Sequence, residues 1–292
     1  MKIKIVATTN IGLERENNED AYLLCPDLSL QDWMCDDMSS YVSLGEQGTL
    51  VVVADGMGGA NAGEIASNLA LESVKTVFSK ENTASSIKSD DYSGLLKQAI
   101  KVADDAINLK IDKDPDTSGM GTTIVICWIV NSIAHIAWCG DSRCYSYNPI
   151  SGLKLLTKDH SYVQDLVDNG IISEQEAFNH PDSNIITRGL GDIQPPAVPD
   201  IISWELSSED FLLLCSDGLS GYCTNSQIER VLDDNYIDIT RCRDELLRLA
   251  LDAGGYDNIS IAIVSVLSNT GKELVPISFV RKIRKCFYRL FR

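Results

Sequence analysis

Five continuous apolar runs, rich in Val and Ile, constrain the fold of this 292-residue chain more than any other feature. Short runs of this composition predict strands that are buried on both faces. Asn131 and Ser132, between the second and third runs, predict a tight hairpin. The chain is therefore predicted to be built around buried sheets, with strands at residues 50–54, 122–130, 133–139, 211–215 and 259–267.

Three segments between these runs place apolar residues at helical spacing, at 63–79, 92–110 and 241–253. Helices and strands do not alternate strictly, and one connection is a hairpin. This order predicts antiparallel sheets covered by helices. No linker, repeat or low-complexity tract divides the chain, so we expect one domain over residues 1–270 and a short tail over 271–292.

Composition excludes some classes of function. The formal net charge of −17 argues against nucleic acid as a partner, because phosphates require a basic surface. The acids either cover a solvated surface or converge on cations, and composition does not separate the two. Nine irregularly spaced cysteines without metal-ligand spacing predict reduced, mostly buried thiols. Because a signal-like region and a membrane-length apolar stretch are absent, we expect a cytoplasmic protein.

Four of the apolar runs end in an aspartate or lead into one: Asp55, Asp141, Asp217 and Asp257. Taken singly, each aspartate has another interpretation. A single Asp-Gly is usually a turn, and Asp141 near Arg143 is consistent with a surface ion pair. Together, carboxylates at several strand ends can meet at one edge of a sheet. Such a cluster suits Mg²⁺ or Mn²⁺, and two ions can activate water and stabilise charge on a phosphoryl group.

An ordered set of motifs resembles the metal-dependent protein phosphatases of the phosphatase 2C type, in particular their bacterial branch. Any single motif is weak, whereas the ordered set is specific. The resemblance runs from about residue 7 to residue 267. It implies an α+β fold, a four-layer α-β-β-α sandwich with two central, mostly antiparallel sheets flanked by helices. The matching segments are 12–20, 54–59, 119–123, 140–143, 159–161, 180–181, 187–191, 215–219 and 257–258.

The resemblance also implies roles for individual residues. Asp141 matches a carboxylate of a third, weaker metal site. Arg15 matches the arginine that binds the substrate phosphate, a role suited to a planar guanidinium. Glu19 and Asn258 lie next to expected ligands and are expected to orient them or their waters. The ligands of two Mn²⁺ or Mg²⁺ ions are expected to be Asp20, Asp55, the Gly56 carbonyl, Asp217 and Asp257.

The implied reaction is single-step hydrolysis of phosphoserine and phosphothreonine by a metal-bridging hydroxide. Animal members carry a histidine after Asp-Gly as the proposed acid, whereas this chain has Met57, so a metal-bound water is the expected proton donor. The implied partners are phosphoprotein substrates, with a bacterial serine/threonine kinase and its targets among them. Two alternatives stay open: a catalytically silent binding module of the same fold, and a phosphatase dedicated to one anti-sigma-factor-like regulator.

Three further segments carry expectations. Residues 157–200 match the variable flap beside the active site, where His160 and His180 are expected to make structural polar contacts. Residues 27–48 form an insertion, interpreted as an extended surface hairpin rather than a partner-binding cap. Residues 277–292 predict a basic amphipathic helix, with six Lys and Arg and no acid from 281 onward. Such a tail is typical of binding to an anionic membrane surface or an acidic partner; docking on its own body and disorder are alternatives.

Overall fold

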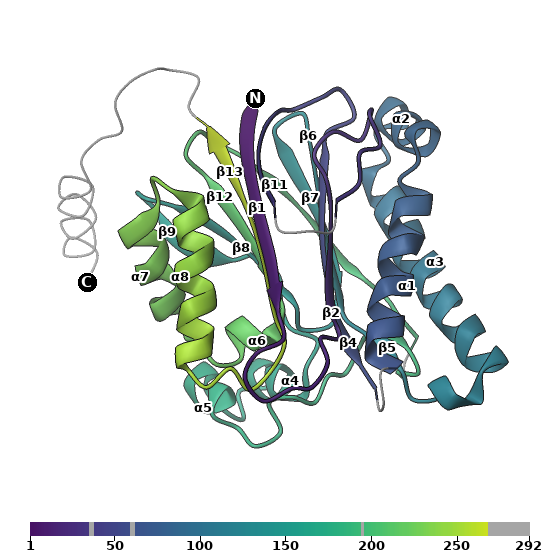
Figure 1. Ribbon diagram of the computed structural model, residues 1–292, viewed down its shortest axis with the longest axis vertical. Coiled ribbons are helices and arrows are strands. Elements are labelled where there is room, and N and C mark those ends of the chain that lie inside the picture. Colours follow the sequence, from purple (N-terminus) through teal and green to yellow (C-terminus); the bar gives the residue numbers. More distant parts are fainter. Residues whose placement is uncertain (35–37, 59–61, 194–195, 268–292) are drawn as a thin grey trace.

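Two antiparallel sheets lie face to face in the computed structural model, which describes residues 1–34, 38–58, 62–193 and 196–267 (Figure 1). The first sheet contains, in order, β3 (Met38–Ser43), β1 (Lys2–Asn10), β13 (Ile259–Leu267), β12 (Phe211–Cys215), β8 (Arg143–Asn148) and β9 (Gly152–Leu155). The second contains β10 (Leu190–Gly191), β5 (Gly121–Thr122), β4 (Thr49–Met57), β6 (Ile124–Val130), β7 (Ile133–Cys139) and β11 (Asp200–Glu205), with β2 (Asp20–Cys25) also paired to β4.

Helices cover the outer face of each sheet (Figure 1). The second sheet is covered by α1 (Ala62–Val77) and α3 (Tyr92–Lys113), with α2 (Lys80–Ser89) beside α3. The first sheet is covered by α7 (Asn225–Asn235) and α8 (Ile239–Asp252). Three short helices, α4 (Tyr162–Asp168), α5 (Glu174–Phe178) and α6 (Asp217–Ser220), and the 3₁₀ turn Pro115–Thr117 lie in connections. The predicted four-layer α+β sandwich is confirmed.

The apolar runs are continuous because each strand is buried on both faces. In β4, Val51 and Val53 point into the layer between the two sheets, where Leu212 of β12 also lies. Val52 and Ala54 point the other way and pack beneath α1 and α3. Successive side chains of a strand alternate between faces, so a strand sandwiched in this way has no exposed side to mark it as polar.

The hairpin predicted at Asn131 and Ser132 joins β6 to β7, where Val130 pairs with Ile133. Both turn residues have positive φ, 50° and 64°. A two-residue turn with this pair of conformations matches the right-handed twist of the flanking strands, and Asn tolerates it better than most residues.

The segment 27–48 differs from its prediction as a surface hairpin. β3 pairs along β1, from Lys2 opposite Ser43 to Ala7 opposite Met38, and so becomes an edge strand of the first sheet. Before the strand, Met34 exchanges two backbone hydrogen bonds of 2.9 Å with Leu24. The hairpin prediction is therefore wrong, because residues 38–43 pair with β1 and Met34 pairs with Leu24, while the hydrogen bond from Leu28 N–H to the Gly48 carbonyl closes only the base of the segment.

Other expectations concern the whole chain. The seven cysteines in the described ranges are all free and buried, as predicted, while Cys35 and Cys286 lie outside those ranges. The predicted amphipathic tail, 277–292, also lies outside them. In the same ranges we find no helix with the length and apolar character needed to cross a bilayer.

Candidate metal centre

The pairing of β2 with β4 brings two of the predicted ligands together. Asp20, the first residue of β2, lies directly opposite Asp55 of β4. Directly opposed residues of an antiparallel pair have Cβ atoms about 4.5–5.5 Å apart. The two carboxylates are therefore neighbours through backbone register alone.

The first sheet supplies acids at the same end of the sandwich, where α6 lies (Figure 1). Asp217 begins α6 directly after β12, and Asp257 comes just before β13, the strand paired with β12. Asp141 lies in the turn between β7 and β8. The charges of Asp20, Asp141 and Asp217 all act on Asp55, so the four acids share one electrostatic environment.

Ser216 fixes Asp20 across the gap between the two sheets. Its hydroxyl donates a 2.6 Å hydrogen bond to Asp20 Oδ2 and accepts one of 2.9 Å from the Ser260 backbone N–H. Ser216 is fully buried. The sequence motif around Asp217 contains Ser216 but gave no reason to assign it this role, because the contact joins residues that only the fold brings together.

Asn258 holds the loop that leads from β1 to β2. Its Oδ1 accepts a 2.7 Å hydrogen bond from the Glu19 backbone N–H. Its Nδ2 donates to the carbonyl oxygens of Ile11 at 3.0 Å and Asn17 at 2.9 Å. The Asn258 side chain thus fixes the loop that carries Arg15.

Gly56 lies where three backbone segments meet. Its N–H donates to the Glu19 carbonyl at 3.2 Å. A Cβ at this position would collide with the Gly63 carbonyl at the start of α1. A Cβ at Gly63 would in turn lie 2.7 Å from the Glu19 carboxyl carbon. Glycine at both positions lets β4, the Glu19 backbone and the start of α1 come this close.

Burial makes ionisation of these carboxyls unfavourable. It raises the pKa of Asp20 to about 7, and the charges of Asp217 and Asp257 act in the same direction while the Ser216 hydrogen bond opposes them. Burial likewise raises the pKa of Asp217 to about 6. The pKa values of Asp55 and Asp141 rise well above their usual range, again chiefly through burial. Nearby cations would reverse this effect by stabilising the ionised forms.

Two oxygens in the cluster point to what it could bind. Asp20 Oδ1 and Asp217 Oδ1 are buried and have no hydrogen-bond partner among the residues that the structure describes. Buried charged oxygens are normally paired or coordinate metals. The all-oxygen donor set fits Mg²⁺ or Mn²⁺. Within the described ranges, however, no three His, Cys, Asp or Glu side chains already form a ready ligand set.

Arg15 contacts the cluster through one of its acids. Its Nη2 lies 2.7 Å from Asp257 Oδ2, and the Arg15 side chain remains 50% exposed. The hydrogen bond to Asp257 raises the pKa of the guanidinium, so it stays charged. Arg15 therefore presents donors to solvent at the edge of the acid cluster. The pairing of Arg15 with Asp257 was not predicted, because Arg15 was assigned to the substrate phosphate and Asp257 to the metal ions.

The turn around Asp141 is tied to the start of the predicted flap. Asp141 is buried, and the ion-pair partner of Arg143 is Asp159, with Nη2 2.6 Å from Oδ2. The alternative of a surface ion pair between Asp141 and Arg143 is thus wrong. His160 accepts a 3.1 Å hydrogen bond from the Gly140 N–H at Nδ1, and its Nε2 lies 3.2 Å from Asp200 Oδ2.

Both flap histidines make structural contacts, as predicted. His160 is buried and its ring stacks near Trp138, with centroids 6.1 Å apart. His180 accepts a 3.2 Å hydrogen bond from the Asp182 N–H and packs edge-on against Tyr162.

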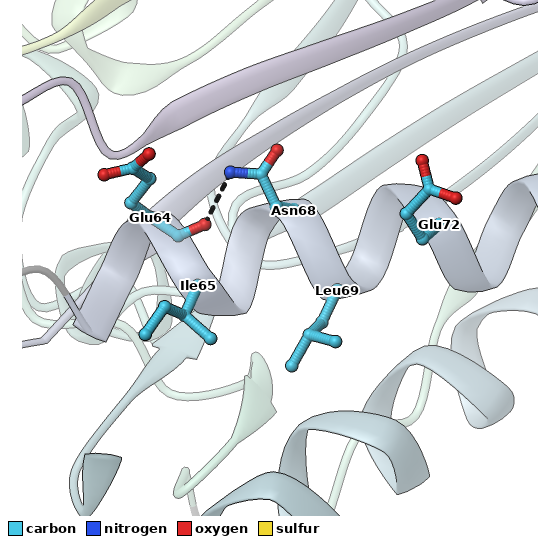
Figure 2. A pocket seen from close by; sticks show the side chains of 5 residues that line it. All are labelled: Glu64, Ile65, Asn68, Leu69 and Glu72. Carbon is cyan, nitrogen blue, oxygen red and sulfur yellow. Dashed lines mark hydrogen bonds between the residues drawn. The ribbon is translucent and has the colours of Figure 1, made fainter. Parts of the chain in front are cut away.

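A hollow lies along α1, lined by other residues than the predicted site residues (Figure 2). Within it, Asn68 Nδ2 donates a 2.8 Å hydrogen bond to the Glu64 carbonyl oxygen. None of the residues assigned to metal or phosphate lines it; the lining consists of Glu64, Ile65, Asn68, Leu69 and Glu72.

This sequence is similar to those of known proteins over most of its length. A family model described as protein phosphatase 2C matches residues 14–259. The serine/threonine phosphatase stp of Listeria monocytogenes is 36% identical over 216 residues, which cover 74% of this chain and 83% of that protein. The protein phosphatase PhpP of Streptococcus pneumoniae is 32% identical over 268 residues, covering 90% and 98% respectively.

Solved structures share the fold. The crystal structure of the Mycobacterium tuberculosis serine/threonine phosphatase PstP/Ppp matches with a TM-score of 0.75 and 29% identity, covering 92% of this chain and 100% of that one. The catalytic domain of PstP in complex with two manganese ions matches with a TM-score of 0.71 and 28% identity, at the same coverage. The chain therefore belongs to the protein phosphatase 2C family and is a protein phosphatase.

Proposed function

We propose that the protein hydrolyses phosphoserine and phosphothreonine in protein substrates at a binuclear Mn²⁺ or Mg²⁺ centre. The observation that carries the proposal is the buried acid cluster, in which Asp20 Oδ1 and Asp217 Oδ1 have no hydrogen-bond partner in the described part of the chain. The relatives named as serine/threonine phosphatases, and the neighbour that binds two manganese ions, support the substrate and the metal. The proposed ligands are Asp20, Asp55, the Gly56 carbonyl, Asp217 and Asp257, with Asp141 at a third, weaker site.

Two bound ions would supply a nucleophilic water and neutralise charge on the phosphoryl group. The protein's own residues then have positioning roles. Arg15 holds the phosphate oxygens with its fork of N–H donors, because a guanidinium matches the phosphate geometry. In the free enzyme, Asp257 occupies part of this fork. Glu19 and Asn258 keep the Arg15 loop and Asp20 in register, through the hydrogen bond from Glu19 N to Asn258 Oδ1.

The biological partner that we propose is a bacterial serine/threonine kinase, whose phosphorylated targets, and whose own phosphorylated residues, this enzyme would dephosphorylate. The flap segment, 157–200, would shape which phosphoproteins fit, since Asp159 and His160 near its start are bonded to the turn that carries Asp141. The tail, 277–292, would bring the enzyme to an anionic membrane surface or an acidic partner.

The test is phosphate release from a phosphothreonine peptide by the purified protein, with Mn²⁺ and with EDTA. We expect turnover with Mn²⁺, its loss in EDTA, and a loss of at least about a hundredfold in Asp217→Asn, because that change removes a charged ligand. Asp252→Asn, an exposed acid at the end of α8, serves as the matched control and should be fully active. Folded, Mn²⁺-loaded protein that releases no phosphate from any of several peptides would instead identify a binding module.

A further inference from the structure

Three exposed apolar side chains from separate segments lie beside the candidate metal centre. Leu13 is 67% exposed, Tyr222 37% and Tyr256 53%. The rings of Tyr222 and Tyr256 are in contact, with centroids 5.5 Å apart and an interplanar angle of 40°. The Leu13 backbone N–H donates a 2.7 Å hydrogen bond to the Gly255 carbonyl, which joins the β1–β2 loop to the turn before β13. We call these three residues the tyrosine shelf.

The tyrosine shelf borders the pair formed by Arg15 and Asp257. Tyr256 directly precedes Asp257, and Leu13 lies two residues before Arg15 on the same loop. Tyr222 follows α6, which begins at Asp217. Burial raises the pKa of the Tyr222 hydroxyl, and the charges of Asp217 and Asp257 raise it further. The shelf is thus close enough to the acid cluster for their charges to act on it.

Two glycines allow this arrangement. Gly254 and Gly255 have φ of +125° and +54°. A Cβ at Gly255 would lie 2.8 Å from Leu13 Cγ, and one at Gly254 would collide with the Tyr256 ring. The turn before β13 therefore has no side chains of its own at these positions. Leu13 and Tyr256 take up that space and still present their outer surfaces to solvent.

Scattered exposed apolar residues are ordinary, but a group gathered next to a reactive site marks an interaction surface. An extended peptide advances about 3.3–3.6 Å per residue, so the neighbours of a phosphorylated residue lie within about 7 Å of it. We propose that the tyrosine shelf is a specificity surface that binds an apolar side chain adjacent to the phosphorylated residue of a protein substrate. This inference rests on the proposed function and names the sequence class that the enzyme prefers.

Apolar contacts of this kind give moderate selectivity. A side chain that packs on a partly exposed surface gains less than one that enters a closed pocket, where a methylene changes specificity by about 10–200-fold. We therefore expect a leucine next to the phosphothreonine to raise kcat/KM by about tenfold over glycine. Because both tyrosine rings contribute through their faces, the hydroxyl groups are dispensable for this effect.

The experiment uses phosphothreonine peptides that differ only by leucine or glycine at the positions immediately before and after the phosphothreonine. The measured quantity is the leucine-to-glycine ratio of kcat/KM, in Mn²⁺, for the full-length protein. We expect a ratio of about ten at one of these positions. Tyr222→Ala and Tyr256→Ala should each lower the ratio toward one, whereas Tyr222→Phe and Tyr256→Phe should keep it. Ile237→Ala, at a similarly exposed residue between α7 and α8, is the matched control and should keep the wild-type ratio.

Because the ratio compares two substrates of one enzyme, a general loss of activity in a variant does not imitate the effect. A wild-type ratio near one at both positions would overturn the shelf and leave the phosphatase function intact. A leucine-to-glycine ratio that stays at its wild-type value in both Tyr222→Ala and Tyr256→Ala would also overturn the shelf and leave the phosphatase function intact. Failure to hydrolyse any peptide would refute the proposed function itself, and the inference that rests on it.

Discussion

Raising the pH is expected to destabilise the protein when it is free of metal. The pKa of Asp20 in the folded state is about 7, against an ordinary value of 3.8. Between these pH values the folded state binds more protons than the unfolded state, so the free energy of unfolding falls as pH rises. The stabilisation that comes from the proton on folded Asp20 is complete below pH 3.8 and is lost as the pH rises through about 7. Asp217, with a folded pKa of about 6, acts in the same direction.

The size of the effect follows from the pKa difference. Each pH unit over which Asp20 is protonated only in the folded state changes the free energy of unfolding by about 1.4 kcal/mol. From about pH 5 to pH 7, Asp20 alone should therefore remove a little over 2 kcal/mol, because it is already half ionised at pH 7. No allowance for solvent is needed, because the residue is only 7% exposed. Asp217 shares this environment, so the two contributions do not simply add.

The assay is urea unfolding in EDTA, followed by tryptophan fluorescence, at several pH values from about 5 to 8. Burial lowers the pKa values of His135 and His160, which makes stability rise with pH and so opposes the effect. Asp20→Asn removes the carboxyl but keeps both histidines, so the difference between the two slopes cancels the histidine contribution and reports the Asp20 carboxyl together with its effect on the neighbouring acids. Excess Mn²⁺ should instead stabilise the wild type more at higher pH, because ligands must be ionised to bind.

The reasoning would be refuted if wild type and Asp20→Asn showed the same slope in EDTA. Such a result would mean that Asp20 is already ionised in the folded, metal-free protein at pH 5. The buried carboxyl would then have a compensating partner, and its unpaired Oδ1 would not indicate a metal site.

Two further changes test residues that position the site. Asn258→Ala removes three hydrogen bonds that hold the β1–β2 loop, so we expect a loss of about 3 kcal/mol in urea unfolding, and a loss under 1 kcal/mol would show that the loop is held elsewhere. His160→Asn keeps an acceptor for the Gly140 N–H, whereas His160→Gln keeps only the donor to Asp200. Because Gly140 is buried and the Asp200 side chain is 45% exposed, the melting temperature should fall less for Asn than for Gln, and the reverse order would contradict this assignment.

The strands predicted from sequence are those buried on both faces, because only they form continuous apolar runs. β4, β6, β7, β12 and β13 were found in this way. β1 begins with alternating Lys and Ile, and β11 is an edge strand that is exposed at Ser203 and Glu205. Their patterns are weaker because one face or one end meets solvent. β3 was missed because its pairing with β1 depends on a distant segment.

The sequence by itself singled out the candidate metal ligands, because an ordered series of aspartates, each beside a buried strand, is typical of a cation site at the edge of a sheet. It also determined the family, through motifs spread along most of the chain. The tertiary structure alone decided how these residues meet. Register places Asp20 opposite Asp55, and the packing of the two sheets brings Ser216 onto Asp20.

The tertiary structure alone also decided the surface around the site. Leu13 and Tyr256 are far apart in the chain. Their backbones come together because β1 pairs with β13 as far as Asn10 opposite Ile259, and the Leu13 N–H then donates to the Gly255 carbonyl. Motif matching ranks residues by the chemistry of their side chains, so it overlooks apolar residues whose role depends on position. Position is set by long-range pairing and loop closure, which no local stretch of sequence encodes.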